Sequence, residues 1–159
     1  MRIPVNTSGS YPTITISTDA SGNALANGIS VISTQKITIT NNNPTYEYTT
    51  FQDKDTNVLT LPAKNSIATT IVIDDVNYFG NTTATSGSAA YLGIAGIASN
   101  KVPVNFRVTL NGTSTTTGSR YYAGTGYITN LSPEASPEAP IWITPISIAV
   151  NGSYTTGVQ

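Results

Sequence analysis

Alternation of apolar and polar residues is the feature of this sequence that most restricts its fold. Every second residue of the stretch VPVNFRVTL, residues 102–110, is apolar. Successive side chains of a β-strand point to opposite faces, so the pattern predicts a strand with one buried face. The same alternation recurs at residues 14–16, 37–39, 67–73 and 146–150. Pro145 is expected to start the last of these strands or to place it at a sheet edge, because proline cannot donate to a ladder.

The segment SAAYLGIAGIASN has apolar residues at helical spacing instead. Ser88 is expected to cap the N-terminus of a helix, and Asn100 to end it in a left-handed conformation. Gly93 and Gly96 would each destabilise a helix by about 1 kcal/mol relative to alanine, which suggests that the helix approaches a sheet closely there. The fold class predicted from these patterns is mainly β, a small β-barrel or sandwich with one helix, residues 88–99, packed against it.

Length and composition favour one domain that can associate with copies of itself. The 159 residues fit a single domain, with residues 1–12 as an extended N-terminal arm. Only 9% of the residues are charged and the net charge is -1, so little long-range repulsion keeps copies apart. Lysine and arginine are scattered singly, which disfavours tight nucleic-acid binding. No apolar run is long enough to cross a membrane and no secretion signal is present, so we expect a soluble product of the cytosol with no membrane partner.

Catalytic and metal chemistry finds little support in the sequence. The chain has no cysteine and no histidine, which excludes disulfides and mechanisms that depend on histidine. Asp53, Asp55 and Asn57 have the spacing with which a calcium loop starts, but Val58 and Lys64 occupy the positions that require glycine and glutamate. A solvated turn is the better interpretation.

The remaining acidic pairs do not suggest an active site either. Asp74 and Asp75 are neighbours at the end of a predicted strand, where they point to opposite faces and are expected to be solvated or in a subunit contact. Glu134 and Glu138 lie in a proline-rich loop that offers no cleft to raise a pKa. No histidine or Ser-x-x-Lys pattern is available to activate the many hydroxyl groups. We therefore expect no enzyme activity, no catalytic residues, no metal and no cofactor.

The stretch YYAGTGYITNLSP contains two glycines one residue apart. A dinucleotide-binding loop would need a third glycine at the start of a helix, whereas Thr129 lies here in a β-prone run. Gly124 and Gly126 are expected on the same strand face as Tyr122 and Ile128. They would leave space there for another backbone or for a helix.

These segments together resemble the major tail protein, or tail tube protein, of long-tailed bacteriophages. The resemblance rests on NVLTLPAKNSIATTIVIDD, on the alanine-rich helix 89–99 leading into VPVNFRVTL, and most of all on YYAGTGYITNLSPEASPEAP followed by ITPISIAVNGSY. The residues that fit the family's glycine-bearing strand are Gly124, Gly126, Ile128, Thr129 and Leu131. The family's final strand is matched by Ile148, Val150 and Gly152.

The resemblance implies a structural protein of the virion, made in the host cytoplasm. It would pair with itself in homohexameric rings stacked into a tube, and meet the tape-measure, tail-terminator and distal tail proteins. DNA would pass through the tube without sequence-specific binding. Three segments without core periodicity are candidates for ring-to-ring contacts: the loop Thr45–Lys64 with Asp53 and Asp55, the loop Asn130–Pro140 with Glu134 and Glu138, and the arm before Tyr11.

One alternative function assigns several tyrosines to sugar binding. A carbohydrate-binding or adhesin-like β-sandwich would present several of them as a platform for sugar rings, although a tyrosine serves more often in a core or an interface. This alternative predicts a monomer with exposed, coplanar aromatic side chains.

Overall fold

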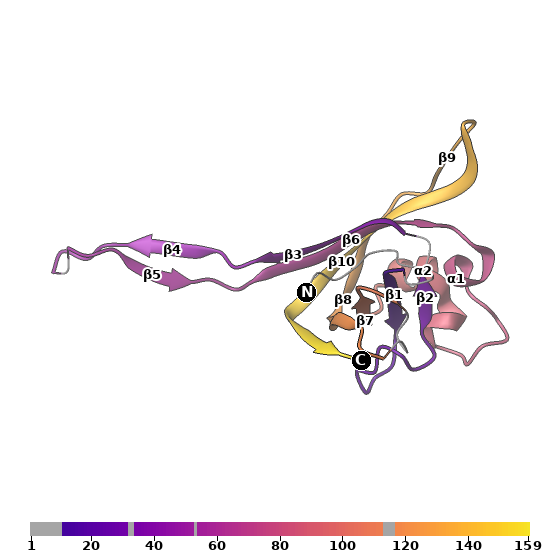
Figure 1. Ribbon diagram of the computed structural model, residues 1–159, viewed down its shortest axis with the longest axis horizontal. Coiled ribbons are helices and arrows are strands. Elements are labelled where there is room, and N and C mark those ends of the chain that lie inside the picture. The colour runs from indigo at the N-terminus through magenta and orange to yellow at the C-terminus, as the bar shows by residue number, and fades with distance from the viewer. Residues whose placement is uncertain (1–10, 32–33, 53, 113–116) are drawn as a thin grey trace.

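The computed structural model describes residues 11–31, 34–52, 54–112 and 117–159. An eight-stranded antiparallel sheet forms the body of the protein (Figure 1). Along the sheet the strands are ordered β2 (Ile29–Val31), β1 (Thr13–Ser17), β7 (Val104–Thr109), β8 (Arg120–Leu131), β10 (Ala139–Val158), β6 (Lys64–Val72) and β3 (Thr34–Asn42), and β9 (Glu134–Ser136) pairs with the start of β10. The predicted mainly β fold class is confirmed.

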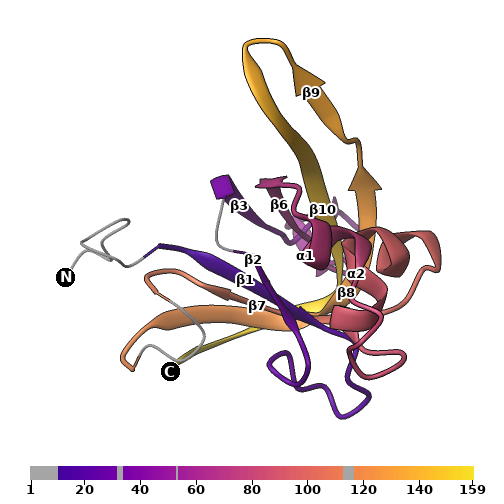
Figure 2. The same ribbon diagram turned by 90° about the vertical axis from the view of Figure 1, so that its right-hand side faces the viewer.

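The sheet curls so that its two ends approach each other, as the view in Figure 2 shows. Val31 ends β2 at one edge and Thr34 starts β3 at the other, and three residue steps span at most about 11 Å. Side chains from the two ends also surround one small gap in the core, which is lined by Ile14, Ile16, Val31, Ile67, Thr69, Ile71, Ile146 and Ile148. The curled sheet therefore closes over a single apolar core, as expected of a small sandwich or open barrel.

The predicted alternation is seen most clearly in β6. Its inward side chains are buried and its outward ones are half-buried or exposed along the whole strand. Ile67 and Ile71 join the core, as do Phe106 of β7 and Ile148 of β10. Burial of each such side chain contributes about 1.5–3 kcal/mol, so the alternation predicted from the sequence provides much of the stability of the fold.

Pro145 does not start the last strand, contrary to the sequence-based expectation. β10 already begins at Ala139 and pairs with β9 as far as Ile143, and its pairing with β8 begins at Ile146. Pro145 falls between these two ladders, opposite Thr70 of β6 on the other side. A residue without an N–H group is tolerated at that gap.

The helix α2 (Ala89–Ser99) packs against the sheet as predicted, and Ile94 and Ile97 are fully buried in the core. The Ser88 side chain accepts a hydrogen bond from the Tyr91 N–H at 3.2 Å, as expected of an N-cap. The left-handed residue at the other end is Lys101, with φ 52°, and not Asn100, with φ -87°.

Gly93 bends α2 through a positive φ of 67°. The close approach predicted from this glycine is real, but it is made to a second, five-residue helix, α1 (Asp75–Phe79), and not to the sheet. A Cβ atom on Gly93 would collide with the backbone of Tyr78 and Gly80. At Gly96 a Cβ would find only an ordinary contact, 3.5 Å from the Cβ of Leu92.

A long two-stranded arm projects from the body (Figure 1). It continues the β3–β6 hairpin into a second ladder made of β4 (Thr45–Tyr48) and β5 (Asn57–Thr60). Pro44 and Pro62 interrupt the strands between the two ladders, since proline cannot donate to a ladder. The Leu61 N–H still donates to the Pro44 carbonyl at 2.9 Å and keeps the two chains together.

Candidate assembly surface

The arm carries a row of exposed apolar side chains. Tyr46 lies directly opposite Leu59 in the β4–β5 ladder, and Tyr48 lies on the same face two residues along. Their exposed fractions are 59%, 53% and 43% respectively. Among the described residues no second layer covers this ladder, so the three side chains have no core to enter there. We call Tyr46, Tyr48 and Leu59 the arm face.

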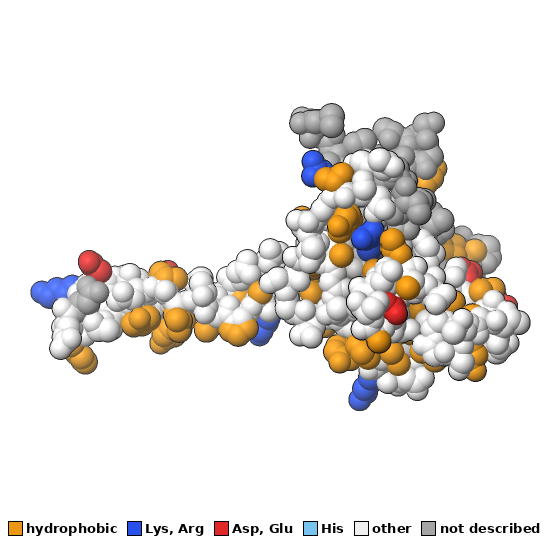
Figure 3. Space-filling view, turned by 90° about the horizontal axis from the view of Figure 1, so that it is seen from below, with side chains coloured by type: hydrophobic (Ala, Val, Ile, Leu, Met, Phe, Trp, Pro, Cys, Tyr) orange, Lys and Arg blue, Asp and Glu red, His pale blue; other side chains and the backbone are white. Residues whose placement is uncertain are grey.

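The two faces of the arm differ in character. The rings of Tyr46 and Tyr48 are stacked, with centroids 6.4 Å apart and an interplanar angle of 17°. The opposite face contains Glu47 and Val58 between threonines. Beyond β4 the chain turns at Phe51, whose side chain is fully exposed. Hydrophobic side chains gather along the arm in Figure 3.

An arm of this kind gains little stability from its own contacts. An isolated two-stranded hairpin is marginally stable in water, and contiguous exposed apolar surface typically marks a site of protein–protein contact. The segment 45–64, predicted to be a loop, is thus a hairpin with an apolar side. The bounds of this projecting segment were predicted from the sequence, but its two-stranded structure was not.

The acidic residues singled out in the sequence lie at two separate places. Asp55 is exposed near the tip of the arm, while Asp53 lies outside the described residues. Glu134 and Glu138 lie on a second, shorter hairpin, in β9 and in the turn that leads to β10, and both are exposed. Within the described ranges no three acidic, histidine or cysteine side chains gather as a metal site would require. Asp55 and the glutamate pair are therefore not part of such a group in these ranges.

The second hairpin also exposes large apolar groups. Ile141 and Trp142, at the start of β10, are 50% and 58% exposed. The Trp142 carbonyl accepts a hydrogen bond from the Ile73 N–H at 2.9 Å, which fixes the base of this hairpin to the end of β6. The hairpin rises from the body well away from the arm (Figure 1).

The sheet has long edges without a strand partner among the described residues. β3 ends the strand order on one side. The pairing of β7 with β8 stops at Gly126, so the outer edge of residues 127–131 has no neighbouring strand within the same ranges. Unpaired strand edges are templates for pairing with another chain.

The outward face of β8, β10, β6 and β3 consists mostly of small, uncharged side chains. Register and burial place these residues on it: Thr38, Thr40, Ser66, Ala68, Thr70, Thr125, Tyr127, Ser147 and Ala149. None of them is charged. Lys36 and Lys64 lie at its margins, near the ends of β3 and β6. We call this surface the neutral face.

The glycines of the family-like strand serve packing inside the protein. Gly126 lies so close to β10 that a Cβ would lie 3.0 Å from both the Ala149 carbonyl carbon and the Ile148 Cγ2, and closer still to the Ala149 oxygen. At Gly124 the space is filled by the Phe106 ring, 3.0 Å from the position of a Cβ. The space predicted beside these glycines is thus occupied by a backbone and a ring of this same chain. On the same strand Ile128 is buried, Thr129 is exposed and Leu131 is half-buried.

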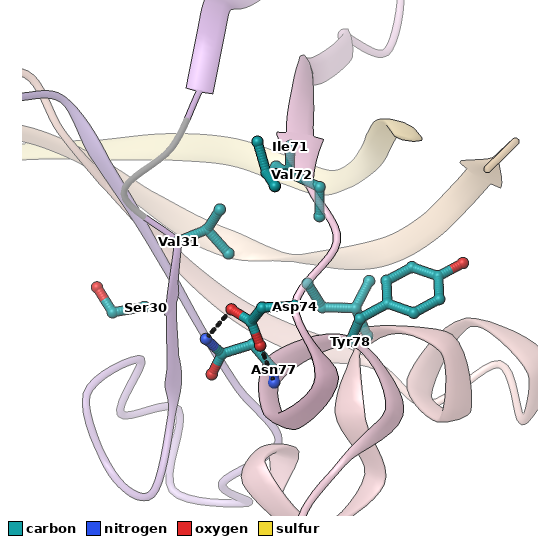
Figure 4. A pocket seen from close by; sticks show the side chains of 8 residues that line it. Ser30, Val31, Ile71, Val72, Asp74, Asn77 and Tyr78 are labelled. Atoms are coloured by element: carbon teal, nitrogen blue, oxygen red, sulfur yellow. Dashed lines mark hydrogen bonds between the residues drawn. The ribbon is translucent and has the colours of Figure 1, made fainter. Parts of the chain in front are cut away.

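A pocket of about 230 Å³ lies beside α1 (Figure 4). The helix α1 lies at the end of the body remote from the arm (Figure 1). Its lining is Ser30, Val31, Ile71, Val72, Asp74, Asn77, Tyr78 and Ile94. The Asp74 carboxylate accepts hydrogen bonds from the Asn77 N–H and from the Asn77 side-chain amide, both at 2.6 Å. Asp74 is therefore the N-cap of α1, and it is also exposed just after the end of β6, which agrees with the solvated strand end expected from the sequence. Burial raises the pKa of the Tyr78 phenol.

A second phenol helps to hold the sheet together. The Tyr154 hydroxyl lies 2.7 Å from the Ser66 carbonyl and 2.9 Å from the Thr40 carbonyl, as a donor between β6 and β3. Burial raises the pKa of Tyr154 and the nearby Tyr122 adds to that rise, while the hydrogen bond to Ser66 opposes it. No helix among the described residues is long and apolar enough to span a membrane.

The geometry defines a curled antiparallel β-domain with one main helix, a projecting apolar arm and open strand edges. A chain from the tail of an empty gene transfer agent particle, refined with C6 symmetry, has the same fold: the TM-score is 0.59 over 91% of this chain and 95% of that one, at 15% identity. A chain from the virion of a native gene transfer agent particle matches with a TM-score of 0.56, at the same identity and coverage. The sequence matches no protein-family model and no curated protein.

Proposed function

We propose that this chain is a structural subunit of a phage-like tail, located in the virion, and that it polymerises as stacked hexameric rings to form the tail tube. The observation that carries the proposal is the apolar arm face on a fold shared with the tail of a gene transfer agent particle. The C6 symmetry of that tail supports six subunits per ring. Such a role requires no catalytic group, metal or cofactor.

Pairing of strand edges is the proposed bond within a ring. The free edge of β3 from one subunit joins the free edge of residues 127–131 from the next, which satisfies backbone groups that would otherwise attract unrelated chains. The contact joins two different surfaces, so it is repeated by rotation until the ring closes. In such a ring the four strands from β8 to β3 continue from subunit to subunit.

The neutral face supports a channel for DNA. In a ring built from continuous sheets, one face of each sheet points toward the axis, and the other face here is the apolar core. Most side chains of the neutral face are Thr, Ser and Ala, and its only cations in the described ranges, Lys36 and Lys64, are confined to its margins, so few phosphate contacts are available. DNA would slide past it without sequence-specific binding.

Contacts between rings are assigned to the projecting segments. The arm extends well beyond the body, and the β9–β10 hairpin with Glu134 and Glu138 projects from the body in a different direction (Figure 1). The tape-measure, tail-terminator and distal tail proteins are the further partners that a tail tube requires, inside the tube and at its two ends.

Negative-stain microscopy of the purified protein tests the proposal. Hollow tubes or six-fold rings are expected, and monomers that persist at high concentration would overturn it. A matched pair of variants tests the role of the arm face: Leu59→Ser changes the arm face, and Val58→Ser changes a similarly exposed aliphatic side chain on the opposite face, at 60% exposure. Tubes should be shorter or absent only with Leu59→Ser, and equal behaviour of the two variants would contradict the assignment of this face.

One observation favours the second candidate, a carbohydrate-binding module. The rings of Tyr46 and Tyr48 are exposed and nearly parallel, and exposed aromatic rings are what a sugar platform requires. A glycan array with the wild-type chain and with Tyr46→Ala and Tyr48→Ala variants tests it. Binding by the wild-type monomer that is lost in both variants would favour this function, and no binding would remove it.

A further inference from the structure

The pocket beside α1 and the tip of the arm complement each other in size and chemistry. We propose that the pocket receives Phe51 from another copy of this chain, which makes it the acceptor site for the arm. The inference rests on the proposed function as a polymerising subunit and assigns the partner surface that the arm contacts.

The volume of the pocket suits a phenyl ring. A cavity of about 150 Å³ lined by apolar side chains binds benzene, and this pocket measures about 230 Å³. Val31, Ile71, Val72, Tyr78 and Ile94 supply apolar lining.

The charged group of the pocket does not oppose an apolar guest. Asp74, the only charged side chain among the lining residues, already accepts two hydrogen bonds from Asn77 (Figure 4). A phenyl ring that enters therefore leaves no carboxylate oxygen of Asp74 without a donor.

The positions of the two surfaces require a second copy. The arm leaves one end of the body and α1 lies at the other end (Figure 1), so the tip of the arm between β4 and β5, which includes Phe51, lies far from the pocket of its own chain. A contact between two different surfaces of identical chains repeats from copy to copy. Head-to-tail stacking along the arm direction therefore brings each arm toward the α1 end of the next subunit.

The arm and the surface beside the pocket together supply a substantial part of the apolar area that a stable contact needs. With Tyr46, Tyr48 and Phe51 at 59%, 43% and 110% exposure, the arm offers roughly 400 Å² of aromatic surface. That is about half of what one partner contributes to a standard interface. Beside the pocket, α1 exposes Val76 and Phe79 at 53% and 66%, so apolar surface continues from the pocket onto the helix.

Cross-linking of assembled protein tests the inference. The chain has no cysteine, so a Gln52→Cys, Val76→Cys double variant carries one thiol beside Phe51 and one beside the pocket. A short bis-maleimide applied to tubes should give a ladder of multiples of 16.6 kDa on a denaturing gel. The matched control is Gln52→Cys with Val158→Cys, because Val158 is similarly exposed, at 49%, but lies at the end of β10. Adding Phe51→Ala to the first pair should lower the ladder yield about tenfold, as loss of an interface anchor does.

The outcomes separate the inference from the proposed function. Tubes that give no ladder with Val76→Cys, or an equal ladder with Val158→Cys, overturn the acceptor site and leave the tail subunit in place. An undiminished ladder with Phe51→Ala overturns the role of Phe51. A protein that forms no assembly of any kind overturns both proposals.

Discussion

Substitution of Gly126 by alanine tests how β8 and β10 pack. A Cβ at this position would lie 3.0 Å from the Ala149 carbonyl carbon and from Ile148 Cγ2, and closer to the Ala149 oxygen. Carbon atoms in contact prefer about 3.5–4.0 Å, so the two backbones must separate by about 1 Å. Backbone atoms cannot rotate away as the end of a side chain can, and the strain is therefore borne by the strand pairing itself.

The expected loss of stability follows from that separation. Lengthening by about 1 Å breaks backbone hydrogen bonds, each of which contributes about 0.5–1.5 kcal/mol. With two or three bonds lost and about 1–3 kcal/mol of overpacking strain, Gly126→Ala should lower the free energy of unfolding by about 3–5 kcal/mol. The loss should lower Tm by about 10 °C, and for a domain at the low end of the typical stability range of about 5–15 kcal/mol part of the protein would unfold at room temperature.

Gly124→Ala is the matched control on the same strand face. Its new Cβ would lie 3.0 Å from Phe106 Cζ and 3.4 Å from Cε1, the far end of a ring that can shift by a few tenths of an ångström. Removing glycine also restricts the unfolded chain, which stabilises by about 0.4–1 kcal/mol. We expect a change within about 1 kcal/mol. Urea unfolding followed by circular dichroism measures both variants, and equal stabilities would refute the argument.

Two other predictions concern the N-cap of α1 and the phenols of Tyr78 and Tyr154. Asp74→Ala should destabilise the protein by about 1 kcal/mol or more, because it removes the cap of α1 and leaves the Asn77 N–H without its acceptor. Thermal unfolding measures the loss, with Asp75→Ala in the first turn of the same helix as the control. Equal effects of the two substitutions would contradict the capping role. The raised pKa values of Tyr78 and Tyr154 mean that the folded state favours the neutral phenols. Their contribution to stability is complete below about pH 10 and is lost as the pH rises through the folded-state pKa values. Tyr154→Phe should reduce this alkaline loss in a series of melting curves, and an unchanged slope would argue against it.

Elements with long, regular patterns were predictable from the sequence. The isoleucines of β6 alternate over the whole strand, and Ser88 precedes an apolar helical repeat, so both elements are where the sequence places them. The five-residue helix α1 has too few residues to show a period. It becomes recognisable only from the contact of Asp74 with Asn77.

The arm shows where local patterns stop being informative. Tyr46 and Tyr48 alternate with polar residues, but two prolines and a short ladder interrupt the pattern, and segment 45–64 was predicted to be a loop. Nothing in the sequence says that the face so formed lacks a covering layer. Likewise, Gly126 was correctly read as a site of close packing, yet only the register of β8 on β10 identifies Ala149 as its neighbour.

The central position of β10 makes folding depend on the strand of the sheet that is synthesised last. β10 lies between β8 and β6, and joins the β2-β1-β7-β8 group to the β6–β3 hairpin. At about 5–20 residues per second, roughly 70 residues separate the end of β6 from the start of β10, so several seconds pass before the two groups can unite. Until then β6 and β8 expose the edges that β10 will cover, and such edges attract other chains. A nascent chain interrupted before β10 is therefore an aggregation hazard, and completion of this one strand converts it into a closed domain.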